Sequence, residues 1–138
     1  MLIQNRTALL IGLISACTLL TGCSGSNRPW EVVPVSGIVT YKGEPVEGLT
    51  VEFEPEQGRP SQALTDENGR FTLNYTINEN GAQVGVHQVT FTWVGTSAGD
   101  KPSPAVQKLV ELHGRSGAPL TIEISDATDD LAIELPQE

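Results

Sequence analysis

Short segments of alternating apolar and polar residues, separated by turn residues, are the feature that most constrains how this chain can fold. The clearest case is Leu49, Val51 and Phe53, which alternate with polar residues over 49–54. This alternation is typical of a β-strand with one face buried and the other exposed to solvent. We therefore expect a chain built of half-buried strands.

The same pattern recurs along the sequence, so further strands can be placed by residue number. The expected strands cover 33–41, 71–77, 86–94, 120–124 and 131–135. Residues 61–65 form a weaker candidate with little apolar character, and we expect an edge strand there. Turns or loops are expected at 42–43, 55–60, 66–69, 78–85 and 126–130.

The interval 96–119 departs from the alternating pattern and predicts one short helix. Ser103 can cap its first turn, Pro104 suits the first helical position, and Gly114 can end it. Apolar residues and one histidine follow at helical spacing: Val106, Leu109, Val110 and His113.

About seven short strands and one helix predict an all-β protein, namely an antiparallel β-sandwich, with a barrel as the alternative. The chain has 14 glycines and 9 prolines, a combined share of about 17% against the average of ~12%, so it turns often.

The N-terminus has the layout of a lipoprotein signal peptide. Arg6 supplies a positive charge, residues 7–22 are uncharged, and Leu20-Thr21-Gly22 directly precedes Cys23. The apolar run is short of the ~20 residues that cross a bilayer, which disfavours a transmembrane helix. An ordinary secretory signal is the other alternative. The predicted organisation is a signal peptide over 1–22, a lipidated Cys23 with a flexible tether over 23–31, and a β-sandwich domain over 32–138.

Cysteine and charge counts limit what the mature chain can do. Cys17 lies in the segment that would be removed, so Cys23 would be the one remaining thiol and no internal disulfide could form. Without Arg6, seven Lys and Arg stand against 17 Asp and Glu. Such an acidic chain disfavours binding to nucleic acid or to anionic phospholipid, so the lipid anchor would hold it to the membrane.

Three motifs carry a resemblance to a known family. They are the run over 34–37 and 43–51, the segment Thr65-Asp66-Glu67-Asn68-Gly69-Arg70-Phe71, and Gly85-Val86-His87-Gln88-Val89. Over about Val33 to Val94 the chain resembles the carboxypeptidase regulatory-like, transthyretin-like domain of short bacterial lipoproteins. The resemblance implies a seven-stranded sandwich without catalytic residues. His87 departs from the family pattern, which has an aromatic residue there.

Candidate metal and catalytic residues are few. Asp66, Glu67 and Asn68 lack the ligand spacing of an EF-hand and suit a hairpin turn. His87 and His113 stand on different elements without nearby cysteines, so we expect neither a zinc site nor another metal or cofactor. His87 is expected in the core or at its rim. No Gly-x-Ser-x-Gly motif occurs, and we expect no enzymatic activity.

Outward-facing glutamates could form an acidic face for a cationic partner, although solvation and protection against edge-to-edge aggregation explain them without a partner. These residues are Glu52, Glu54, Glu123 and Glu134.

The leading hypothesis is a membrane-anchored lipoprotein of the cell envelope, a monomer that acts as a structural or protein-interaction module. The alternative is a domain that binds carbohydrate or another small ligand. An exposed aromatic residue in a concave pocket would favour the alternative. The sequence predicts a buried Trp93 and leaves Trp30 alone on the tether.

Overall fold

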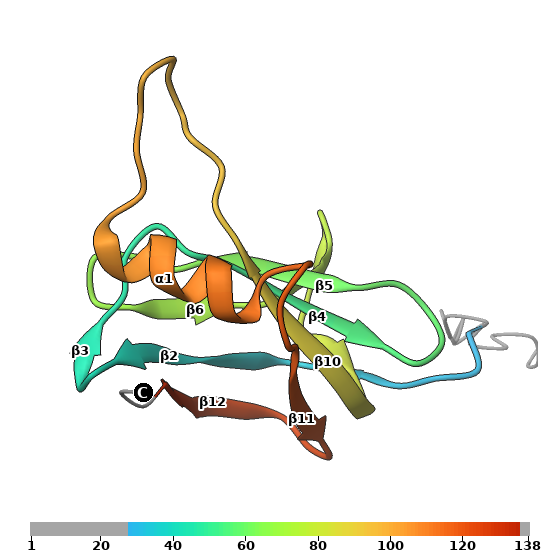
Figure 1. The fold of residues 1–138 in the computed structure, drawn as a ribbon. Coiled ribbons are helices and arrows are strands. Elements are labelled where there is room, and N and C mark those ends of the chain that lie inside the picture. Colours follow the sequence, from blue (N-terminus) through green and yellow to red (C-terminus); the bar gives the residue numbers. More distant parts are fainter. Residues whose placement is uncertain (1–27, 136–138) are drawn as a thin grey trace, which may run out of the picture.

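The computed structural model describes residues 28–135, which form two main β-sheets packed on a shared core, a separate two-stranded ribbon and one helix (Figure 1). This confirms the predicted all-β sandwich. The predicted signal peptide and the lipidation site at Cys23 lie outside the described residues.

The larger sheet has six antiparallel strands. In spatial order they are β11 (Leu120–Ile124), β10 (Gly85–Thr92), β4 (Thr50–Pro55), β5 (Ser61–Leu64), β7 (Asn74–Thr76) and β8 (Glu79–Asn80). The alternation in β4 and β10 turns Val51, Phe53, Val89 and Phe91 toward the core, where each is fully buried.

The second sheet is organised around β2 (Val35–Tyr41). Its partners are β12 (Thr128–Leu135), β3 (Glu44–Pro45) and β6 (Arg70–Thr72). A separate two-stranded ribbon pairs β1 (Val32–Val33) with β9 (Ala82–Gln83). Val35 and Val39 of β2 complete the core from this side.

β12 runs parallel to β2, whereas every other strand pair is antiparallel within the described residues. Leu131 of β12 lies opposite Gly37 of β2. A Cβ atom at Gly37 would overlap the backbone of Leu131, so only glycine allows the two strands to approach this closely.

Helix α1 (Pro104–His113) confirms the prediction from the sequence. The Ser103 hydroxyl accepts a hydrogen bond from the Val106 N–H at 3.3 Å, and the Gly114 N–H closes the C-terminal end on Val110. Val106 and Leu109 are buried, and the helix packs against β10. The loop that joins β10 to α1 projects away from the body of the domain (Figure 1).

Two predicted turns have the expected chemistry. Lys42 and Gly43 both have positive φ, 57° and 81°, as a two-residue hairpin requires. In the turn over 66–69, the Asp66 carboxylate accepts from the N–H groups of Asn68 and Arg70, both at 2.9 Å. Of the Asn68-Gly69 pair, only Gly69 has positive φ.

Several placements from the sequence are wrong in detail. The segment 61–65 is not an edge strand, because β5 lies between β4 and β7. The expected strand over 71–77 is divided: β6 pairs with β2, the chain crosses at Leu73, and β7 joins the other sheet. Ile77 is fully exposed beyond the end of β7. The expected loop 78–85 contains the short strands β8 and β9.

Candidate functional site

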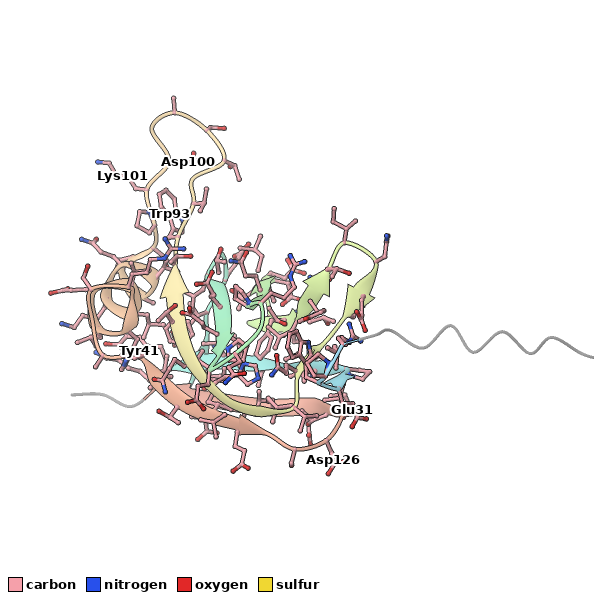
Figure 2. All side chains as sticks on the ribbon, turned by 90° about the vertical axis from the view of Figure 1, so that its right-hand side faces the viewer. Glu31, Tyr41, Trp93, Asp100, Lys101 and Asp126 are labelled. Atoms are coloured by element: carbon pink, nitrogen blue, oxygen red, sulfur yellow. The ribbon has the colours of Figure 1, made fainter. Side chains whose placement is uncertain are left out.

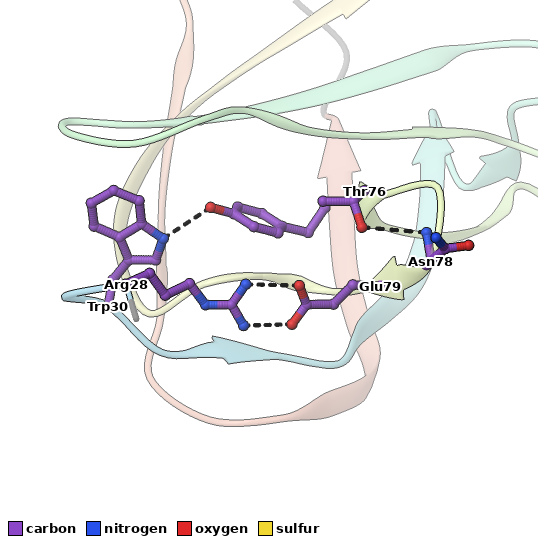
Figure 3. Close-up of polar contacts among 6 residues, drawn as sticks. Arg28, Trp30, Thr76, Asn78 and Glu79 are labelled. Carbon is purple, nitrogen blue, oxygen red and sulfur yellow. Dashed lines mark hydrogen bonds and ion pairs between the residues drawn. The ribbon is translucent and has the colours of Figure 1, made fainter. Parts of the chain in front are cut away.

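The described domain begins with a segment that is fixed to its surface by an ion pair. Arg28 Nη1 and Nη2 donate to the two carboxylate oxygens of Glu79 at 2.7 and 2.5 Å (Figure 3). The hydrogen bond from Arg28 lowers the pKa of Glu79, and the same bond raises the pKa of Arg28. Planar, bidentate pairing of this kind fixes direction as well as distance.

Trp30 is fixed by a second contact. Its indole Nε1 donates to the Tyr75 hydroxyl at 2.9 Å, and the side chain is partly buried (Figure 3). The guanidinium groups of Arg28 and Arg59 both lie over the Tyr75 ring, 5.2 and 5.6 Å from its centroid. The placement of Trp30 alone on the tether is therefore wrong, because this residue packs on the domain.

A groove of about 380 Å³ opens beside Trp30. Its lining combines apolar and amide side chains from the N-terminal segment, the β4–β5 loop and the strands β9 and β10, including Pro29, Trp30, Pro55, Gln57, Gln83 and Val86. The side-chain oxygen of Gln83 is buried and has no hydrogen-bond partner among residues 28–135. Val86 is 49% exposed. The described surface therefore includes a hollow with an aromatic wall and an unused acceptor.

The two histidines lie in different environments, as the sequence predicts. His87 is buried in the core against Phe53, with ring centroids 5.8 Å apart, and its Nε2 donates to the Gln83 carbonyl at 2.6 Å. His113, in the last turn of α1, bonds through Nδ1 to the Ala118 carbonyl at 2.8 Å. The predicted core position of His87 is confirmed.

Three of the four candidate glutamates share one face. Glu52, Glu54 and Glu123 lie on the outer face of the larger sheet, and Glu54 and Glu123 are exposed. Glu52 is half-buried and accepts a hydrogen bond from Gln62, with Arg115 at 3.9 Å. Glu134 belongs to the other sheet, so the four do not form a single acidic face.

Trp93 stands at the base of the projecting loop, near Asp100 and Lys101 and far from Glu31 (Figure 2). Its side chain is half-buried against the core, so the predicted burial of Trp93 is confirmed only in part. Asp100 organises the loop by accepting from the Thr96 hydroxyl, the Ser97 N–H and the Thr96 N–H, all within 2.9 Å. These bonds, led by the Thr96 hydroxyl, lower the pKa of Asp100.

No cluster of three or more His, Cys, Asp or Glu side chains that could hold a metal ion occurs in the described residues. Among the same residues, no helix is long and apolar enough to cross a membrane.

The contacts made by Arg28, Tyr75, Arg59 and Glu79 were not predicted from the sequence. One feature of the sequence could have indicated them. Trp30, Val32 and Val33 are apolar, so the apolar pattern of the domain already begins within the predicted tether.

Comparison with known proteins gives one match. Residues 35–95, less than half of the chain, match the model of a domain of unknown function (DUF6795). No curated protein and no solved structure matches the chain. The function of the matched domain is unknown, so the match assigns no activity.

Proposed function

We propose that this protein is a lipid-anchored β-sandwich of the cell envelope and acts as a non-enzymatic structural or protein-interaction module. One observation carries the proposal: Cys23 of the predicted lipobox stands five residues before Arg28, the first residue that the structure describes. Five residues span at most about 18 Å. A lipid on Cys23 would therefore hold the sandwich close to the membrane surface.

The contacts of Arg28 and Trp30 support this arrangement. A tether that ended in a loose segment would leave the domain free to rotate. Here the ion pair with Glu79 and the hydrogen bond to Tyr75 fix the direction in which the chain enters the domain. The loop over 93–103 projects at a distance from Glu31, so an envelope protein could reach it while the domain is anchored (Figure 2).

The positions of the histidines support a role without catalysis. His87 is 1% exposed, with one ring nitrogen bonded to a backbone carbonyl, so substrate could not reach it. His113 is bonded to the Ala118 carbonyl at the end of α1. A general base has to stand within hydrogen-bond reach of a reacting group, and neither imidazole lines the grooves described for residues 28–135.

Metabolic labelling with a palmitate analogue tests the anchor. Each buried methylene adds about 0.8 kcal/mol of membrane affinity, so two or more acyl chains give stable attachment. Wild-type protein and the matched control Cys17→Ala should both be labelled, and Cys23→Ala should not. Label retained in Cys23→Ala, or lost in Cys17→Ala, would show that the assignment is wrong.

A further inference from the structure

We infer that the groove beside Trp30 binds a short, neutral saccharide. This inference goes beyond the proposed function, because binding of a saccharide in this groove does not depend on the lipid anchor. The volume of the groove, about 380 Å³, lies within the range of small-ligand sites.

The aromatic wall is the first argument. Because the Trp30 indole N–H is already bonded to Tyr75, the rest of the ring offers the groove an apolar surface in a fixed orientation. Pro29 and Pro55 extend this apolar lining without flexible side chains. A pyranose ring has one face of C–H groups that packs on such a surface, and its hydroxyl groups remain at the ring edge.

The polar lining is the second argument. Gln57 and Gln83 bring amide groups to the groove, and Glu56 brings a carboxylate. The Gln83 oxygen is buried without a partner, and a buried acceptor without a donor is costly. Gly58 lies directly beside this oxygen and beside the Trp30 ring. A ligand hydroxyl that reaches the Gln83 oxygen from the groove would donate the missing hydrogen bond.

The charge of the lining selects among ligands. No lysine, arginine or histidine lines this groove within the described chain, and Glu56 is its charged member. Glu56 and the acidic charge of the whole protein repel anionic ligands such as uronic acids or phosphorylated compounds. An apolar wall with amide groups and one acceptor carboxylate matches a ligand that is rich in hydroxyl groups and uncharged.

The test uses the mature protein as it is expressed in cells, purified in detergent micelles. Cellobiose, maltotriose and N,N′-diacetylchitobiose are titrated at millimolar concentration by calorimetry. A Trp93→Phe background makes the tryptophan emission report on Trp30 alone. At least one of these saccharides should bind and shift that emission, and cellobiouronic acid should bind more weakly than cellobiose.

Three variants locate the site. Gln57→Ala should weaken binding about five- to tenfold, the effect of one lost hydrogen bond, because Gln57 is exposed and makes no other bond in the described part of the chain. Trp30→Ala should abolish binding. The matched control Gln88→Ala, exposed on β10 outside the groove, should bind as wild type. If Trp30→Ala fails to fold, the comparison of Gln57→Ala with Gln88→Ala decides whether the groove is the binding site.

The inference is overturned if none of the three saccharides binds the folded protein, if the acidic sugar binds best, or if Gln57→Ala leaves the affinity unchanged. Binding in micelles is independent of anchoring in the cell. A protein that carries the lipid label but binds no saccharide would refute this inference and leave the proposed function standing. A protein that binds a saccharide but carries no lipid label would refute the proposed function and leave this inference standing.

Discussion

Removal of the Tyr75 hydroxyl isolates one contact that holds the N-terminal segment on the domain. Tyr75→Phe keeps the buried ring beneath Arg28 and Arg59 and deletes only the oxygen that accepts from Trp30 Nε1 at 2.9 Å. A hydrogen bond of this kind contributes about 1 kcal/mol net, and its loss also leaves the partly buried indole N–H without a partner. We expect Tyr75→Phe to lower the free energy of unfolding by about 1–1.5 kcal/mol.

Urea denaturation of a version of the chain that begins at Ser24 measures this change. In a thermal scan the same loss corresponds to about 4 °C for a domain of this size. Tyr41→Phe is the control: Tyr41 is half-buried, its hydroxyl makes no hydrogen bond within residues 28–135, and the removal of this hydroxyl should change little. A double-mutant cycle with Trp30→Phe should give a coupling of about 1 kcal/mol.

Equal effects of Tyr75→Phe and Tyr41→Phe would contradict this reasoning. So would a coupling near zero between Trp30→Phe and Tyr75→Phe, because Trp30 would then contribute to stability without the hydrogen bond. Either result would remove the argument that the entry of the chain into the sandwich is fixed by this contact.

Three further predictions concern strand packing, pH and metals. Gly37→Ala should destabilise the domain by about 2–3 kcal/mol in urea, since the added methyl group overlaps the Leu131 backbone; wild-type stability would contradict the close approach of β2 and β12. The pKa of Glu79 is lower in the folded state than in the unfolded state, so its ion pair with Arg28 stabilises the domain above about pH 4 and is lost as the pH falls further. Glu79→Gln should remove this part of the acid dependence of Tm, and an unchanged pH profile would argue against the pair. Calcium and zinc should leave Tm unchanged, and a rise of several degrees would reveal a metal site.

Local alternation predicted the core well, because it depends only on neighbouring residues. Leu49, Val51 and Phe53 are all fully buried, as are Val89 and Phe91. Helix α1 and its two capping residues were predicted, since Ser103, Pro104 and Gly114 are local signals for its two ends.

Strand partners could not be predicted in the same way. Phe71, Leu73 and Tyr75 alternate without a break, yet β6 and β7 belong to different sheets. Both sheets face the same core. Alternate side chains therefore keep pointing inward from β6 to β7, although the strand to which the backbone is hydrogen-bonded changes. The Leu73 N–H bonds to Val35 and its carbonyl accepts from Gly81, which are contacts that the alternation does not specify.

The candidate site could not be predicted from the sequence for a related reason. Trp30 follows a polar, glycine- and serine-containing stretch, which is typical of a tether. Its partner Tyr75 lies 45 residues away. Only the tertiary fold brings the two together and forms the groove from the N-terminal segment, the β4–β5 loop and two strands.

The parallel pairing of β12 with β2 has a consequence for the order in which the molecule can be assembled. The strand that begins at Thr128 lies beside the strand that begins at Val35, so most of the described domain separates two neighbours in one sheet. During synthesis from the N-terminus, this side of β2 stays unpaired until β12 has been made. Contacts this distant in sequence form slowly, so we expect the pairing of β12 with β2 to be a late step of folding.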